Sequence, residues 1–330
     1  MRPPMPEHGG PDGGPDATHD FSTNASPLGP PPALLSAVQQ ADRRAYPDPA
    51  YGVLRRRLGD AHGLRAERVL PTAGGSEGIR RLTSTALRTG RREVWVPQPG
   101  FGDYAAAAQA LGLTVRPYAS PTDIRPAVPA LVWICEPCNP TGTSLTAWPT
   151  LGDEHLLAVD RAYEPLRLRG EAPAVPPHAW QLVCPNKALG LTGVRAGYLL
   201  APAEDAALES ALALAPSWVL SAEGVAMLTH WHDAATADWL VGARAQLRDW
   251  SIAQRRMLET LDWTQQPSCT PFWLARPPRP DIALRLRERG IRVRDAASFG
   301  LPGWVRVSAQ PRRSQDALQQ ALLEIESEDS

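Results

Sequence analysis

From residue 68 onward, short apolar runs alternate with longer segments of helical periodicity. Most of these runs are continuously hydrophobic rather than alternating, as expected for strands buried on both faces of a sheet. The pattern predicts helices over 76–89 and 102–111, which fit between strands of a mostly parallel sheet covered on both faces. The predicted strands are 69–70, 93–96, 114–118, 130–135, 156–160, 180–184 and 197–200.

The remaining segments predict a second, smaller unit and an N-terminal arm. A helical stretch over about 203–260, broken near Pro216, precedes a C-terminal pattern of strands and helices that predicts a small α/β domain. Its predicted elements are strand 272–275, helix 281–289, a strand pair at 291–294 and 304–308, and a last helix from Ser314. We therefore expect an arm and helix over 1–45 that pack with the small domain and over the site, a large domain over 46–215, and a linking helix with the small domain over 216–330.

Charge and composition exclude several classes of partner. The 330 residues carry a net charge of −1 with acids and bases mixed along the chain, so neither a nucleic acid nor a membrane surface is expected as a partner. No apolar run approaches the roughly 18 residues of a membrane span. The N-terminus shows no apolar core typical of a secretory signal, and a cytoplasmic protein is expected.

Cys135 and Cys138 form a Cys-x-x-Cys pair, a spacing found at zinc and redox sites. No second such pair follows, and His230 and His232 are too close together for the usual His-x₃₋₅-His ligand spacing. We expect no metal site.

Two stretches offer groups that bind an anion. Lys187 follows a predicted buried strand, where open α/β sheets place their chemistry, and Arg195 lies eight residues beyond it. Earlier, glycines at 74 and 75 precede a helix that begins near Ser76, and free amides in the first turn of a helix suit a phosphate. Each stretch also has a plain structural interpretation, as a cationic surface loop and as a capped helix start.

Three further polar residues follow predicted strands. Asn139 is held extended before Pro140, Asp160 ends a strand, and Tyr163 follows three residues later. Singly, an Asn-Pro turn or a helix cap explains them. Together with Lys187 they form the set of groups that holds pyridoxal 5′-phosphate: a lysine for the imine, an aspartate for the ring nitrogen, and an amide and a phenol for the 3′-oxygen.

In order, spacing and residue type, these motifs resemble the fold-type I enzymes that depend on pyridoxal phosphate, specifically the class I/II aminotransferase branch that includes histidinol-phosphate aminotransferase. The resemblance spans essentially the whole chain. It implies that the Gly75 and Ser76 amides and Arg195 hold the cofactor phosphate, and that Phe101 stacks on the ring. It also implies a homodimer in which Tyr46 reaches the phosphate of the neighbouring subunit's site.

Within that branch, the His8-Gly-Gly segment, the stretch 20–29 and the late segment 298–308 resemble the threonine-phosphate decarboxylases of cobalamin biosynthesis. This resemblance implies that Arg306 clamps the α-carboxylate of the substrate and that His8, Asn24 and Arg294 surround its phosphate. The expected reaction converts L-threonine O-3-phosphate to (R)-1-aminopropan-2-yl phosphate and CO₂. The alternative is an aminotransferase acting on histidinol phosphate or an aromatic amino acid.

The chain departs from this family at two positions of the lysine motif. Cys184 and Asn186 stand where members usually carry serine or threonine, whose hydroxyls help to bind the cofactor phosphate. Because a thiol is a weak donor, either the phosphate is held less tightly or other amides compensate.

Overall fold

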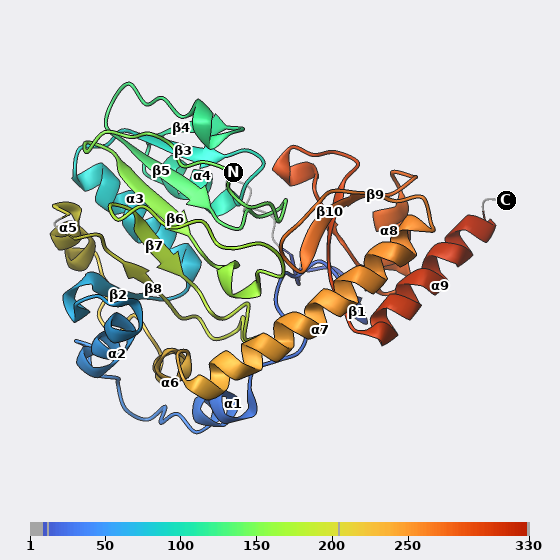
Figure 1. Ribbon diagram of the computed structural model, residues 1–330, viewed down its shortest axis with the longest axis horizontal. Coiled ribbons are helices and arrows are strands. Elements are labelled where there is room, and N and C mark those ends of the chain that lie inside the picture. The colour runs from blue at the N-terminus through green and yellow to red at the C-terminus, as the bar shows by residue number, and fades with distance from the viewer. Residues whose placement is uncertain (1–8, 12, 204, 329–330) are drawn as a thin grey trace.

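The computed structural model describes residues 9–11, 13–203 and 205–328 and shows a large part and a smaller part joined by one long helix (Figure 1). That helix, α7 (Ala234–Glu259), runs diagonally from the base of the large part to the far side of the small one. It is amphipathic, and its buried positions include Leu240, Leu247 and Leu258, which share one face because their spacing follows the helical repeat.

The large part is built on a seven-stranded sheet of order β2-β8-β7-β6-β5-β3-β4. All neighbouring strands pair in parallel except β8, which is antiparallel to both β2 and β7. The fold class expected from the sequence is confirmed. The strands are β2 (Val69–Thr72), β3 (Glu93–Pro97), β4 (Thr114–Tyr118), β5 (Ala130–Cys135), β6 (Leu156–Asp160), β7 (Trp180–Val183) and β8 (Gly197–Leu200).

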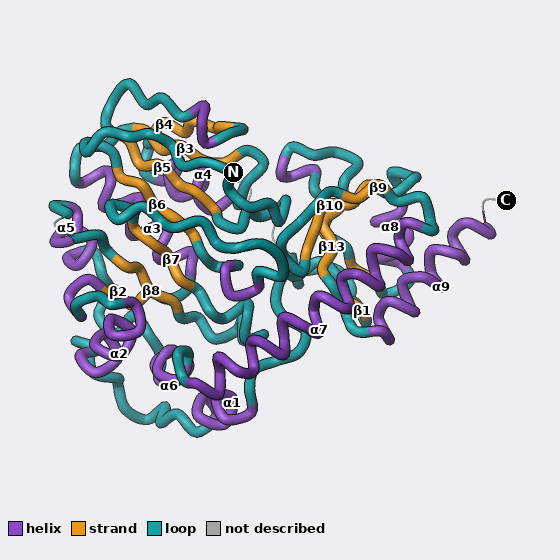
Figure 2. The backbone as a smooth tube through the Cα atoms, viewed as in Figure 1, coloured by secondary structure: helices purple, strands orange, loops and turns teal. Residues whose placement is uncertain are grey.

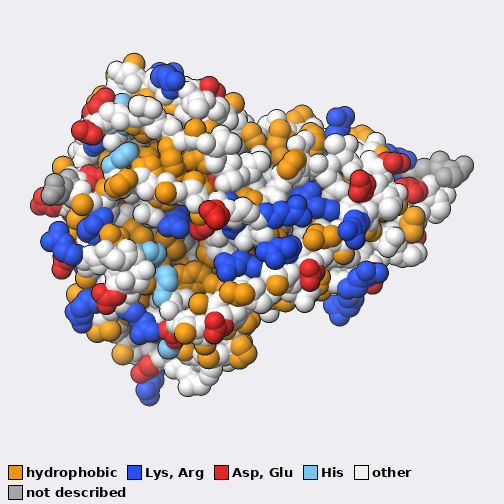
Figure 3. All heavy atoms as spheres, in the orientation of Figure 1, with side chains coloured by type: hydrophobic (Ala, Val, Ile, Leu, Met, Phe, Trp, Pro, Cys, Tyr) orange, Lys and Arg blue, Asp and Glu red, His pale blue; other side chains and the backbone are white. Residues whose placement is uncertain are grey.

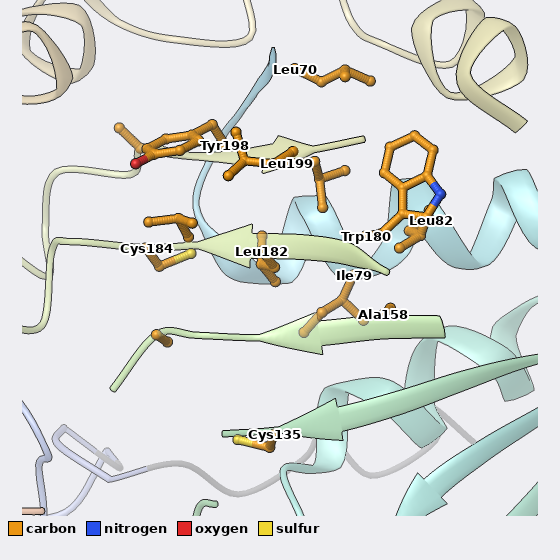
Figure 4. Close-up of a cluster of buried hydrophobic side chains, with 14 of the residues drawn as sticks. Leu70, Ile79, Leu82, Cys135, Ala158, Trp180, Leu182, Cys184, Tyr198 and Leu199 are labelled. Carbon is orange, nitrogen blue, oxygen red and sulfur yellow. The ribbon is translucent and has the colours of Figure 1, made fainter. Parts of the chain in front are cut away.

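Helices pack on one face of this sheet. The α3 helix (Gly75–Arg88) is strongly amphipathic and contacts β2, β5, β7 and β8, with Ile79 and Leu82 fully buried against the strands (Figure 4). Trp180 and Leu182 point into the same core from β7. The other helices of the large part are α1 (Pro32–Gln39), α2 (Gly52–His62), α4 (Gly102–Ala110), α5 (Ala207–Ala213) and α6 (Ala222–His230), with short 3₁₀ turns η1 (Ala66–Arg68), η2 (Pro121–Asp123) and η3 (Glu164–Leu166).

Loops cover much of the opposite face of β5 and β6. Alternate residues of a strand point to opposite faces, and Val132 and Ile134 of β5 join a separate cluster from Leu131 and Trp133. The side chains packed against that second cluster include Leu145, Trp148, Leu151 and Val175, which lie in irregular segments. Figure 2 shows these loops crossing the sheet, and Figure 3 shows hydrophobic side chains gathered there.

The small part is a second α/β layer with its own core. Its antiparallel sheet has the order β12-β13-β10-β9, and two helices pack together beside it. Its elements are β9 (Thr264–Gln265), β10 (Phe272–Arg276), α8 (Ile282–Glu288), β11 (Ile291–Arg292), β12 (Arg294–Asp295), η4 (Ala297–Phe299), β13 (Val305–Ser308) and α9 (Arg312–Glu328).

The N-terminal segment belongs with this small part. β1 (His19–Asp20) pairs in parallel with β11, and Phe21 is fully buried in the core of the small part. The backbone N–H of Ser308 donates to the Phe21 carbonyl at 2.9 Å, so the segment is also hydrogen-bonded to β13. As a result residues 22–24 are carried to the junction between the two parts.

Two expectations from the sequence need correction. The helical stretch over 203–260 consists of three helices, interrupted at 214–221 as well as near 231–233. The predicted strand over 291–294 divides at Val293 into β11, which pairs with β1, and β12, which pairs with β13.

Replacing each of two helical glycines by alanine should change the free energy of unfolding in opposite directions. A Cβ at Gly59 would lie 2.5 Å from the Leu64 carbonyl oxygen, whereas nothing lies within 4 Å of one at Gly242. Gly59→Ala should lower the free energy of unfolding by about 1–3 kcal/mol because backbone has to move. Gly242→Ala should raise it by about 0.5–1 kcal/mol because alanine loses less conformational entropy in a helix. Urea denaturation of the two variants beside the unmutated protein measures both, and equal changes in the two variants would contradict this difference in packing.

Candidate active site

A cavity of about 290 Å³ lies where the carboxyl edge of the large sheet meets the small part and the N-terminal segment. Strands β5, β6 and β7 end at this edge, and Figure 4 shows Cys135 and Cys184 at the tips of β5 and β7. The residues that line the cavity are Gly9, Gly10, Pro11, Thr23, Asn24, Gly75, Ser76, Ile79, Phe101, Tyr104, Cys135, Asn139, Asp160, Ala162, Tyr163, Cys184, Asn186, Lys187, Thr192, Arg195, Phe299 and Arg306.

The cavity brings together most of the residues singled out in the sequence. Those that line it are Gly75, Ser76, Phe101, Asn139, Asp160, Tyr163, Lys187, Arg195, Asn24 and Arg306. Arg294 is not among them, although it is buried, is paired in register with Arg306, and lies over the Phe299 ring at 5.0 Å. Tyr46 is 78% exposed and stacks on Trp218 outside the cavity. His8 lies outside the described residues.

Asp160, at the end of β6, is a buried carboxylate with well-defined partners. Its Oδ2 accepts a 2.7 Å hydrogen bond from the Tyr104 hydroxyl, and its Oδ1 accepts one of 2.9 Å from the Ala162 amide. Burial raises the pKa of Asp160, while the Tyr104 hydrogen bond and the Lys187 ammonium act in the opposite direction. A cationic ring nitrogen beside this carboxylate would offset the cost of burying it. Tyr104 was missed by the sequence reasoning, although it follows Phe101 by one helical turn.

Lys187 is half-buried in the cavity, with its Nζ 5.3 Å from the centre of the Tyr163 ring. Burial lowers the pKa of its ammonium, but the surrounding Tyr163, Cys184 and Asp160 outweigh burial and leave the pKa above its ordinary value. The composition of the chain identifies Lys187 directly, because it is the only lysine among the 34 lysine and arginine residues. No other ε-amine in the chain can form an imine.

The start of α3 forms a cradle for an anion. Gly74 has a φ of 80°, and a Cβ there would lie 2.8 Å from Arg195 Nη2, so glycine is what lets the guanidinium approach the first turn of the helix. Helix amides and an arginine both carry positive charge, and Arg195 has no ion-pair partner among the described residues. A phosphate is the kind of group that satisfies both.

Cys184 and Asn186 lie beside this cradle. A Cβ on Gly75 would lie 3.3 Å from the Cys184 sulfur, and burial raises the pKa of that thiol to about 12, so it stays neutral. Asn186 is buried with its Oδ1 lacking a hydrogen-bond partner in the structure. The glycine cradle suits an anion, whereas the orphaned Asn186 acceptor calls for a hydrogen-bond donor at this end of the cavity.

Arg306, on β13, is a buried cation without a carboxylate partner among the described residues. Its Nη1 donates to Asn139 Oδ1 at 2.6 Å, its Nη2 donates to the Ser22 carbonyl at 2.6 Å, and its Nε has no partner. Burial lowers the pKa of Arg306 to about 10. A buried charge satisfied by neutral groups alone is costly, and an anionic ligand in the cavity would compensate it.

A fixed side-chain network joins Arg306 to the large part. Asn24 Nδ2 lies 3.3 Å from both Asn139 Oδ1 and the Tyr163 hydroxyl. Close to Arg306, the Gly10 amide donates to the Ser22 hydroxyl, and a Cβ on Gly9 would lie 2.1 Å from the Ser22 carbonyl oxygen. The N-terminal segment therefore closes the small-part side of the cavity.

The structure also places the Cys-x-x-Cys pair noted in the sequence. Cys135 and Cys138 are both free thiols, and burial raises the pKa of each. The part of the chain that the structure describes contains no group of three or more His, Cys, Asp and Glu residues suited to a metal ion. No described helix is both long enough and apolar enough to span a bilayer.

Together, the fold and the site define an enzyme that depends on pyridoxal phosphate. The aminotransferase class I and II family model matches residues 18–325, so the chain belongs to that family, and pyridoxal 5′-phosphate is its cofactor. A histidinol-phosphate aminotransferase of Halorubrum lacusprofundi is 30% identical over 336 residues, covering 90% of this chain and 86% of that one.

Solved structures share the fold at lower identity. Histidinol-phosphate aminotransferase from Sinorhizobium meliloti, in complex with pyridoxal 5′-phosphate, has a TM-score of 0.79 at 23% identity, over 96% of this chain and 92% of that one. L-threonine-O-3-phosphate decarboxylase from Porphyromonas gingivalis has a TM-score of 0.76 at 20% identity, over 93% of this chain and 99% of that one.

The single lysine makes the covalent attachment directly testable. Borohydride reduction of the cofactor-loaded protein should fix the cofactor mass on the peptide that contains Lys187, as read by mass spectrometry. Lys187→Arg should retain the charge and carry no such mass. Attachment to another residue, or none in the unmutated protein, would contradict the assignment of Lys187.

Replacing the Cys184 thiol by a hydroxyl should change the affinity for the cofactor. Cys184→Ser places a stronger donor beside the cradle and should tighten cofactor binding about three- to tenfold, the effect of one neutral hydrogen bond worth about 0.5–1.5 kcal/mol. Fluorescence titration of the cofactor-free protein measures the dissociation constant. Cys269→Ser, which lies outside the cavity, is the matched control. Unchanged or weaker cofactor binding in Cys184→Ser would show that other groups already saturate the phosphate.

Proposed function

We propose that the protein decarboxylates L-threonine O-3-phosphate to (R)-1-aminopropan-2-yl phosphate and CO₂, a step of cobalamin biosynthesis. The observation that carries the proposal is the buried Arg306, which faces the cavity with no carboxylate partner among the described residues. A guanidinium in this state suits the α-carboxylate of an amino acid. In support, residues 9–11 also line the cavity, and a Cβ on Gly9 would lie 2.8 Å from Arg306 Nη2, so this segment packs beside the guanidinium.

The second anionic group of the substrate needs its own partners. Arg294 lies directly across from Arg306 in the β12–β13 pair, and both guanidinium groups lie over the Phe299 ring, which lines the cavity. We propose that it supports the substrate phosphate together with His8.

The residues divide the chemistry between binding and proton transfer. When bound, the cofactor supplies a ring that accepts the electron pair released when a bond at the substrate Cα breaks. Asp160 would pair with the ring nitrogen, Phe101 would lie against the ring, and the Gly75 and Ser76 amides with Arg195 would hold its phosphate. Lys187 would hold the cofactor through its Nζ before substrate binds, and afterwards Lys187 Nζ or a water molecule would deliver a proton to Cα. Decarboxylation breaks the Cα–carboxylate bond, CO₂ leaves, and that proton takes its place.

A transaminase is the second candidate, because the curated relatives with about 30% identity are histidinol-phosphate aminotransferases. The two reactions use the same residues and differ in which bond at Cα is held perpendicular to the ring, an outcome that depends on small shifts of substrate position. Under that alternative, Arg306 would bind a group of either the phosphorylated amine or the oxo acid.

We also propose a homodimer in which Tyr46 reaches the phosphate in the partner's site. In support, Tyr46 and Trp218 form a stacked aromatic pair with ring centres 4.4 Å apart, and the two side chains are 78% and 44% exposed. Two large aromatic groups left in water on one surface favour a protein partner.

The decisive assay omits any oxo acid. The purified holoenzyme, incubated with L-threonine O-3-phosphate, should release CO₂ and the amine phosphate in equal amounts over many turnovers. Arg306→Met should reduce kcat/KM about thirtyfold or more, because breaking a buried charge pair costs about 2–5 kcal/mol. Turnover that requires 2-oxoglutarate, with no CO₂ released, would establish the transaminase instead.

A further inference from the structure

The network around Asn24 assigns that residue a role different from the one implied by the family resemblance. Asn24 was expected beside the substrate phosphate. Its side chain is 5% exposed and lies between Asn139 and Tyr163, the two residues expected at the 3′-oxygen of the cofactor. The hydrogen-bonding capacity of the neighbouring side chains determines which atoms face each other.

The guanidinium of Arg306 carries donors only. The Asn139 atom 2.6 Å from Arg306 Nη1 must therefore be its oxygen, Oδ1. The same Oδ1 lies 3.3 Å from the side-chain amide of Asn24, and two oxygens would repel at that place. The Asn24 group that faces it must therefore be the donor, Nδ2.

The two hydrogens of Asn24 Nδ2 then have two acceptors, Asn139 Oδ1 and the Tyr163 oxygen. Because the Tyr163 oxygen accepts from Asn24, its own hydroxyl proton is left for another partner. Asn139 Oδ1 already accepts from both Arg306 and Asn24, so its Nδ2 faces away from them, and no hydrogen bond joins that Nδ2 to any described residue. Asn24 therefore bonds both of these residues: it orients the Tyr163 hydroxyl, and with Arg306 it holds Asn139.

The remaining group of Asn24 is unsuited to a phosphate. Its Oδ1 is buried and has no hydrogen-bond partner in the structure. A carbonyl oxygen can only accept, so it would repel the oxygens of a phosphate. The two hydrogens on Asn24 Nδ2 already bond Asn139 and Tyr163.

We propose that Asn24 is a positioning residue for the cofactor: it orients the Tyr163 hydroxyl and, together with Arg306, holds Asn139, so that both residues donate to the oxygen anion on the cofactor ring. Donors to an anion stabilise it and lower the pKa of the group that forms it. This inference rests on the cofactor of the family and not on the substrate proposed above, so a failure of the decarboxylation assay would leave it standing.

The test is a pH titration of the visible absorbance of the cofactor-loaded protein without substrate. Asn24→Ala should raise the pH of the spectral transition by about one unit, because a donor to the anion loses its orientation. Asn24→Asp should raise it further, since its carboxylate would take the Tyr163 proton for itself and add negative charge. Thr23→Ala is the control, because Thr23 lines the same cavity but bonds only the Ala25 amide.

A double-mutant cycle separates positioning from a direct effect. If Asn24 acts through Tyr163, the shift in Asn24→Ala/Tyr163→Phe should fall clearly short of the sum of the single shifts. Should Asn24→Asp fail to retain cofactor, Asn24→Ser allows the same comparison. An unchanged spectral transition in Asn24→Ala, or fully additive shifts, would overturn the proposal. An unchanged spectrum in Asn24→Ala, together with a raised KM for the phosphorylated substrate, would show instead that Asn24 binds the substrate phosphate.

Discussion

Parallel strands bring their carboxyl ends to one edge of a sheet, and this geometric constraint underlies the whole site. The carboxyl ends of β5, β6 and β7 and the segments that follow them supply Asn139, Asp160 with Tyr163, and Lys187 in turn. These residues lie up to 48 positions apart in the chain, yet adjacent strand pairing places them on neighbouring exits of the same sheet. The small part and the N-terminal segment then only have to close the cavity from the other side.

The charges in the cavity are arranged as if to receive a ligand with charges of its own. Asp160 is buried against a phenol and an amide, and Arg306 is buried against two neutral oxygens. Arg195 approaches the positive end of α3. Each arrangement costs free energy in the protein alone and becomes favourable with a group of opposite charge beside it. Such sites bind their ligand without having to reorganise first.

Much of this could be predicted from the sequence, for reasons that differ between elements. Strands such as β5 and β6 are continuous apolar runs, and the buried sheet follows from that pattern. The β1–β11 pair was missed because each strand has two residues and nothing local indicates a partner about 270 positions away. Ten of the residues that line the cavity were found by motif, whereas Tyr104, which also lines it, and Ser22 act through contacts that no motif contains. The orientation of Asn24 depends on three residues from separate segments, so only the folded chain specifies it.

The presence of a single lysine has a consequence for spectroscopy. Every other basic side chain of the lysine and arginine type in this chain is an arginine, so no second lysine ε-amine contributes a signal beside that of Lys187. Protein grown with lysine labelled with ¹⁵N at the side-chain amine would give one nitrogen resonance for the entire chain. That resonance would follow the protonation of Nζ through cofactor loading and turnover, without any need for assignment.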